Sequence, residues 1–153
     1  MDEIIIDTIV LDYLTRNQKA ITPSARNRIQ QADTVYVSVA SIWELSNHVR
    51  AKMIHIDLDF DEFYQQILLK FGLTLLDTQW QALKFFSSFD YLSYRKPFKK
   101  NIDGKTVIGT KQELHKDPFD RMIIAHAISM NLPLVSPDSL FPHYVPMGLK
   151  LIW

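Results

Sequence analysis

The sequence predicts an α/β fold with a mostly parallel central sheet. Short runs of β-branched and other apolar residues alternate with segments of helical periodicity along all 153 residues. Residues 117–138 show this most clearly, with a helix start, an amphipathic helix, a short buried strand and a turn. No internal repeat or low-complexity tract interrupts the alternation. This order is typical of helices that cross over between parallel strands.

The apolar patterning indicates where each element lies. The run of three isoleucines that ends at residue 6 reads as a fully buried strand. Residues 54–59 read as an extended segment or linker, and the aromatics Trp80, Phe85 and Phe86 are expected to pack in the core. The expected strands are residues 4–6, 34–38, 73–76, 132–135 and 149–153, and the expected helices are residues 10–16, 23–32, 39–52, 60–71, 78–87 and 118–131.

Composition limits the classes of protein to consider. With 47% apolar residues, the chain should fold as one domain over residues 1–153. The absence of cysteine excludes disulfides and thiolate zinc sites, so a metal would need oxygen or histidine ligands. The net charge is zero, which gives no global signal for nucleic-acid binding. We see no signal peptide or membrane-spanning run and therefore expect a cytoplasmic protein without membrane contact.

Acidic residues mark both ends of the late helix–strand unit. Asp117 is a good N-cap before Pro118, and Asp120 lies in the first helical turn, where a carboxylate suits the helix dipole. At 3.6 residues per turn, Asp120 shares the inward face with Ile123, Ile124 and Ala127. Asp138 follows the next strand. A plainer interpretation makes these acids only capping and turn residues.

Two further acids have ambiguous positions. Asp7 ends the first strand, where an open parallel sheet builds its sites, but it could equally cap the next helix. Glu44 lies opposite the apolar stripe of Ile42, Leu45 and Val49, so periodicity alone predicts an ordinary solvated acid.

The first strand and a late strand are neighbours at the switch point of a doubly wound sheet. Asp7, Asp120 and Asp138 would then converge and repel one another unless a cation neutralises them. Ligation by oxygen alone favours Mg²⁺ or Mn²⁺. Such ions activate water and polarise phosphodiesters, so the natural reaction class is metal-assisted phosphodiester hydrolysis.

A basic insertion at about residues 89–114 interrupts the alternation. It interleaves basic residues with aromatics, a combination that suits phosphate contact and base stacking, and residues 101–104 resemble a hairpin turn. A solvated surface excursion is an equally open interpretation. The residues expected to contact RNA are Arg95, Lys96, Lys99 and Lys100.

Three stretches together resemble a known family: IIIDTIVLDYL, VSVASIWELSNHVRAKM and HKDPFDRMIIAHAISMNLPLVSPDSLF. The chain looks like the PIN-domain ribonucleases, specifically the VapC-type toxins of bacterial toxin–antitoxin pairs. The resemblance covers essentially the whole chain and implies a flavodoxin-like, three-layer α/β/α sandwich. Residue by residue, it assigns the catalytic acids to Asp7, Glu44, Asp120 and Asp138.

The resemblance also implies the chemistry and the partners. It implies Mg²⁺ or Mn²⁺ held by Asp7, Asp120 and Asp138, with Thr8 and Asp117 supporting these ligands. It further implies RNA as substrate, a cognate antitoxin that blocks the cleft, and a homodimer. Two departures stand out. Ile9 replaces a histidine that many relatives carry, and the basic insertion is longer than the short link expected, which would alter substrate choice, antitoxin binding or dimer packing.

Other functions fit the sequence less well. A catalytically inactive PIN-like module that binds RNA or protein is the main alternative, although unpaired buried carboxylates would be costly to retain without a role. A phospho-acceptor receiver domain would need an aspartate where residues 34–38 end in serine. A phosphatase with an Asp-x-Asp nucleophile motif would need an aspartate where Ile9 stands.

Overall fold

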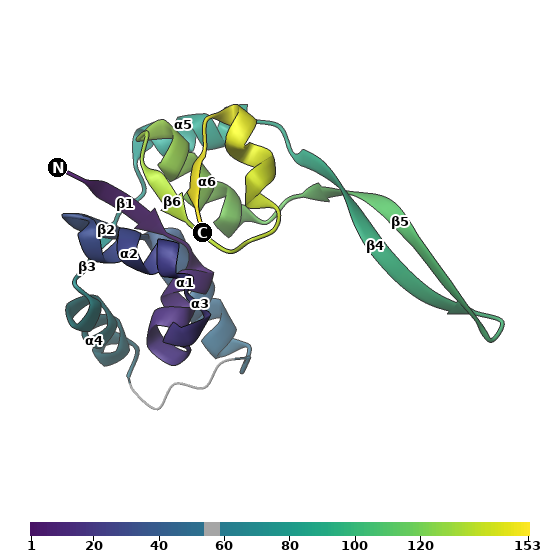
Figure 1. Cartoon of the computed structure of the whole chain (residues 1–153), viewed down its shortest axis with the longest axis horizontal. Helices are drawn as coiled ribbons and strands as arrows, with labels where there is room; N and C mark the ends of the chain where they lie inside the picture. The colour runs from purple at the N-terminus through teal and green to yellow at the C-terminus, as the bar shows by residue number, and fades with distance from the viewer. Residues whose placement is uncertain (54–58) are drawn as a thin grey trace.

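The computed structural model describes residues 1–53 and 59–153 and shows a parallel sheet between helical layers (Figure 1). Five strands lie in the order β3-β2-β1-β6-β7, and all their pairings are parallel. The predicted strands are confirmed to within a few residues at their ends, whereas the predicted extended segment at 54–59 falls almost wholly outside the described residues. The bounds are β1 (Glu3–Ile6), β2 (Thr34–Ser38), β3 (Leu73–Leu76), β6 (Pro133–Val135) and β7 (Lys150–Ile152).

Strand β1 occupies the centre of the sheet, as its three isoleucines predict. It pairs with β2 on one side and with β6 on the other, where Ile5 is opposite Leu134 and Ile6 is opposite Val135. The first strand and a late strand are therefore neighbours, and the order of connections reverses beside β1. This is the switch point at which open α/β sheets build their sites.

Each face of the sheet carries its own apolar core. Ile4 and Ile6 belong to one core and Ile5 to the other, because successive side chains of a strand point to opposite faces. Each isoleucine is fully buried and contributes about 1.5–3 kcal/mol. The core with Ile4 and Ile6 is covered by α1 (Thr8–Arg16), α2 (Pro23–Gln31) and α4 (Phe60–Phe71), and the core with Ile5 by α5 (Trp80–Ser88), α6 (Pro118–Ser129) and the 3-10 segment η2 (Phe141–Met147).

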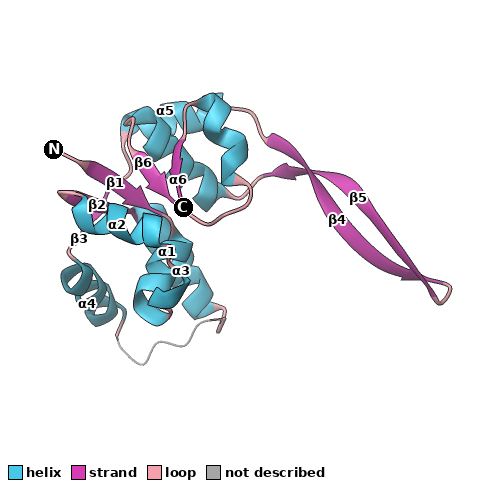
Figure 2. Cartoon of the chain, viewed as in Figure 1, coloured by secondary structure: helices cyan, strands magenta, loops and turns pink. Residues whose placement is uncertain are grey.

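The three-layer α/β/α sandwich is thus confirmed (Figure 2). Helix α3 (Val39–Arg50) contributes to both cores, Ala40 to one and Leu45 to the other. A short 3-10 turn, η1 (Gln18–Ala20), joins α1 to α2. None of the helices in the described ranges is both long and apolar enough to cross a membrane.

A buried histidine holds α6 against the start of α3. His126 Nδ1 lies 3.1 Å from Ser38 Oγ, and Ser38 Oγ also accepts a hydrogen bond from the Ala40 N–H. His126 Nε2 accepts from the Gln79 N–H at 3.5 Å. Burial lowers the pKa of His126 to about 4, so the ring is neutral at neutral pH. Two helices that carry candidate site residues are therefore tied together.

The basic insertion forms a long antiparallel hairpin that extends away from the sandwich (Figures 1 and 2). Its strands are β4 (Leu92–Ile102) and β5 (Lys105–His115). The predicted turn is confirmed, with Asp103 and Gly104 at φ values of 49° and 74°, as a two-residue hairpin turn requires. From residue 92 to the turn and from the turn to residue 115 the insertion is regular sheet, because each strand satisfies the other's backbone groups.

The aromatic residues expected to pack in the core, Trp80, Phe85 and Phe86, do not all do so. Phe85 and Phe86 pack against the core, as predicted. The prediction for Trp80 is wrong, since 74% of this residue is exposed. Trp80 is the first residue of α5, and Ala82 is the fully buried residue of this helix.

Arg121 of α6 anchors the base of the hairpin to the sandwich. Its guanidinium donates to the Phe89 carbonyl at 2.8 Å and to the Asp90 carbonyl at 3.0 Å. It also stacks over the rings of Phe89 and Tyr91, with its Cζ 4.0 and 4.5 Å from their centroids. Arg121 is only 4% exposed, so these contacts are shielded from water.

We expect Arg121→Ala to lower the free energy of unfolding by about 2–4 kcal/mol, because it leaves two carbonyls unpaired and removes cation–π contact. Urea unfolding measures this loss. The control is Arg28→Ala, which removes an exposed pair with Asp2 and should cost about 1 kcal/mol or less. Equal losses in both variants would contradict the anchoring role.

Candidate active site

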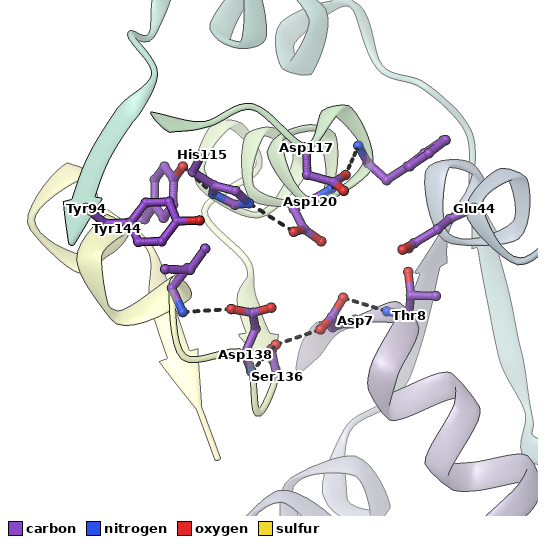
Figure 3. Close-up of polar contacts among 12 residues, drawn as sticks. Asp7, Thr8, Glu44, Tyr94, His115, Asp117, Asp120, Ser136, Asp138 and Tyr144 are labelled. Atoms are coloured by element: carbon purple, nitrogen blue, oxygen red, sulfur yellow. Dashed lines mark hydrogen bonds and ion pairs between the residues drawn. The ribbon is translucent and has the colours of Figure 1, made fainter. Parts of the chain in front are cut away.

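The four acids assigned from sequence all face one hollow at the carboxyl edge of the sheet. Figure 3 shows their carboxylates pointing into the same space from different elements. The hollow has a volume of about 380 Å³. Its lining residues are Asp7, Thr8, Ile9, Asp12, Arg16, Glu44, Leu45, His48, Met53, Asp120 and Asp138.

Asp7 caps α1 and also lines the hollow, so the cap is confirmed and the position is compatible with a role in a site. Its Oδ1 accepts from the Thr8 N–H at 2.6 Å, and its Oδ2 accepts from the Ser136 hydroxyl at 2.7 Å. Burial raises the pKa of Asp7 to about 7, and repulsion from Asp120 and Asp138 adds to the rise against these two hydrogen bonds. A nearby positive charge would therefore be strongly stabilising here.

Asp120 lies in the first turn of α6, as predicted, and a histidine orients it. His115 Nε2 lies 3.0 Å from Asp120 Oδ2, and His115 Nδ1 lies 2.8 Å from the Tyr144 hydroxyl. With Nε2 donating to the carboxylate, Nδ1 accepts from the Tyr144 hydroxyl. Burial raises the pKa of Asp120, while the bond from His115 opposes the rise. His115 ends β5, so this bond joins the hairpin to the hollow.

Glu44 is inside the hollow, which contradicts the helical periodicity and agrees with the family resemblance. Its side chain is 18% exposed because α3 stands beside α1 and α6 at the sheet edge. Burial raises the pKa of Glu44, and the facing Thr8 hydroxyl counteracts part of the rise. Even so, Glu44 Oε2 and Thr8 Oγ1 are not aligned for a well-formed hydrogen bond and are buried without a partner in the described chain. His48 Nε2 lies 4.0 Å from Glu44 Oε1.

Ser136 lies between Asp7 and Asp138 and forms a hydrogen bond with each of these residues. Its hydroxyl donates to Asp7 Oδ2 and accepts from the Asp138 N–H at 3.0 Å. Asp138 also orders the following turn, since its Oδ1 accepts from the Leu140 N–H at 2.7 Å. Sequence reasoning missed both Ser136 and His115. Ser136 follows a buried strand directly, which is the only local signal that either residue offers.

The residues expected to support the metal ligands lie at or near the hollow, whereas the residues expected to contact RNA lie on the hairpin. Thr8 lines the hollow, whereas Asp117 caps α6 by accepting from the Phe119 N–H at 2.9 Å and the Asp120 N–H at 3.3 Å. The structure does not bring the predicted RNA-binding residues into the acidic hollow. They lie on the hairpin strand β4, and they are Arg95, Lys96, Lys99 and Lys100.

The donor set fits a hard divalent cation in its chemistry. Asp7, Thr8, Glu44, Asp120 and Asp138 offer carboxylate and hydroxyl oxygens, and two of these oxygens are buried without a partner in the described chain. Within residues 1–53 and 59–153, no three acidic or histidine side chains are close enough to hold an ion by themselves. Since Mg²⁺ keeps several waters and binds through one or two carboxylates, this spacing suits an ion partly reached through water.

We expect Asp7→Asn, without metal, to be more stable than the wild type at pH 8. The folded-state pKa of about 7 exceeds the ordinary 3.8, so the folded protein holds a proton that the unfolded chain releases. The contribution of this proton to the free energy of unfolding is fully present below pH 3.8 and is lost as the pH rises through about 7. The wild type should lose up to about 4 kcal/mol relative to the variant between pH 4 and pH 8.

Urea unfolding in EDTA across this pH range measures the difference. The control is Asp90→Asn at an exposed position, which should follow the wild type throughout. A difference between wild type and Asp7→Asn that does not change with pH would show that Asp7 is charged in the folded protein at pH 4.

Comparison with known proteins adds an independent view of this arrangement. No curated protein sequence matches the chain. Among solved structures, a chain of VapBC2 from Rickettsia felis, bound to a DNA fragment from its promoter, aligns at a TM-score of 0.56 with 18% identity, covering 97% of this chain and 96% of that one. A chain of VapBC-1 from nontypeable Haemophilus influenzae aligns at 0.57 with 15% identity and the same coverages. These likenesses concern the fold.

The decisive match comes from the sequence itself. The family described as PIN domain matches residues 4–145, a range that contains the sheet from β1 to β6 and the four acids at its edge. The resemblance seen in the sequence is therefore confirmed, and the chain belongs to the PIN-domain family.

Proposed function

We propose that this protein is an endoribonuclease that depends on Mg²⁺ or Mn²⁺ and acts in the cytoplasm as the toxin of a toxin–antitoxin pair. The observation that carries the proposal is the set of four carboxylates, from four different elements, that face one hollow in a PIN fold. Carboxylates with raised pKa values are costly to keep buried, and a catalytic cation would offset that cost.

Each residue has a distinct role in this proposal. Asp7, Asp120 and Asp138 would hold the cation, partly through water, and Glu44, which faces the same hollow, would receive a proton from the attacking water. When bound, the cation supplies Lewis acidity that polarises the phosphodiester and lowers the pKa of water. Thr8 and Asp117 support the ligands through the starts of α1 and α6. No protein nucleophile is needed, because water attacks phosphorus directly.

The hairpin supports RNA as the substrate. The four predicted contact residues, with Tyr94 and Phe98 interleaved, lie on β4, whose first residue, Leu92, is paired with the His115 that bonds to Asp120; they are Arg95, Lys96, Lys99 and Lys100. Basic residues neutralise phosphates and aromatic faces stack on unpaired bases, which suits single-stranded RNA.

The partners of the protein follow from the same proposal. Both structural relatives named above are VapBC structures, which supports a cognate antitoxin that covers the hollow. We also propose a homodimer. A small neighbouring reading frame that encodes a DNA-binding protein, and co-purification of its product with this chain, would support the pairing.

We expect the purified protein to cut total cellular RNA into discrete fragments with Mn²⁺ or Mg²⁺ but not with EDTA. Asp7→Asn, Asp120→Asn and Glu44→Gln should each reduce the cleavage rate by at least about a hundredfold, because each removes a charge that the reaction needs. Gel analysis of timed digests measures the rates, and circular dichroism shows whether the variants remain folded.

The control is Asp12→Asn, which lines the same hollow but pairs with Arg16 on α1. It should retain most of the activity. Full activity in Asp7→Asn and Asp120→Asn would refute the mechanism. No cleavage by the folded, antitoxin-free wild type with any metal would instead favour a PIN-like module that only binds RNA or protein.

A further inference from the structure

A second and larger hollow lies beside the acidic one. It has a volume of about 830 Å³ and separates the base of the hairpin from the segment that follows β6. We call it the hairpin groove. Its lining residues are Ser93, Tyr94, Arg95, Lys96, Pro97, Gln112, Ser139, Leu140 and His143.

The hairpin groove and the acidic hollow share a wall. Asp138 faces the hollow, while the next two residues, Ser139 and Leu140, face the groove. The Leu140 N–H is bonded to the Asp138 carboxylate, so this wall is short and ordered. On the hairpin side, Ser93 lies opposite Leu114, next to the His115 that bonds to Asp120. A chain lying in the groove would therefore reach the candidate catalytic acids directly.

The charges of the two hollows are opposite. The acidic hollow repels a polyanion, so attraction for RNA must come from neighbouring surface. The hairpin, residues 92–115, has six basic and two acidic residues in a chain with no net charge. In the groove, Arg95 is exposed and has no ion pair among the described residues, and Lys96 shares the single carboxylate of Glu113 with Lys111. The groove therefore keeps free positive charge.

We propose that the hairpin groove binds the sugar–phosphate backbone of a single RNA strand and leads it to the acidic hollow. Arg95 and Lys96 neutralise phosphates, Gln112 and His143 offer hydrogen bonds, and Tyr94 presents a ring for base stacking. This inference rests on the proposed function and narrows it. Of the four basic residues predicted to contact RNA, two line the groove, whereas Lys99 and Lys100 lie beyond it.

The lining favours RNA over a protein segment. An amphipathic helix or strand docks through several apolar anchors, and the groove offers only Pro97 and Leu140 as aliphatic contacts. Its other side chains are polar, charged or aromatic, as in grooves that follow a nucleic-acid backbone.

The test measures binding without cleavage. Fluorescence anisotropy with a short, labelled single-stranded RNA in EDTA gives the dissociation constant and its dependence on salt. We expect Arg95→Ala/Lys96→Ala to weaken binding by about tenfold or more and to make the salt dependence shallower. The matched control is Lys19→Ala/Lys84→Ala, which removes two exposed charges from the sandwich and should change binding by about twofold or less.

A second pair of substitutions tests the position on the hairpin. Lys99→Ala/Lys100→Ala removes the same charge farther along β4 and should weaken binding clearly less than the groove variant. Equal losses in the two hairpin variants would overturn the groove in favour of a generally basic arm. Unchanged RNA binding with lost antitoxin binding in the groove variant would overturn it in favour of a protein contact.

These results are independent of the nuclease test. A protein that binds RNA through the groove but cuts no RNA would refute the proposed function and leave the groove intact. A protein that cuts RNA but binds it equally well without Arg95 and Lys96 would refute the groove alone.

Discussion

The constraint on which this structure depends is the placement of like charges at the buried edge of a parallel sheet. Asp7 is 1% exposed, and two other carboxylates repel it. Such a group is unfavourable in a protein interior unless hydrogen bonds or a cation compensate. The hydroxyl of Ser136 and the N–H of Thr8 supply part of this compensation. The unfavourable energy that these hydrogen bonds do not offset would be lowered by a bound cation, and this affinity for positive charge suits the site for catalysis.

The surrounding scaffold keeps these carboxylates from moving apart. His126 and Ser38 hold α6 against the start of α3, so the helices that carry Asp120 and Glu44 cannot separate freely. Arg121 fixes the hairpin base on the same helix. His115, at the end of the hairpin, then orients Asp120. The basic arm and the acidic hollow are consequently parts of one connected network instead of separate features of the surface.

Much of the fold could be predicted because its signals are local. Strand β1 is a run of isoleucines that must be buried, and the cap at Asp117 and the turn at Asp103 and Gly104 need only their neighbours. Trp80 and Glu44 were misjudged by pattern alone, because a helical face becomes core or solvent only when its neighbours are in place. The resemblance to relatives corrected Glu44, whereas nothing local could correct Trp80.

The sequence by itself determined the alternation of helices and strands, the buried first strand and the positions of the acids that follow the strands, and its resemblance to a family implied the sandwich. Periodicity and capping chemistry suffice for the local features, since they depend on residues a few positions apart. Only the tertiary structure decided that Ser136 bonds to Asp7 across 129 positions, that His115 orients Asp120, and that a basic groove adjoins the hollow. These features arise where distant segments meet, and no local pattern encodes such a meeting.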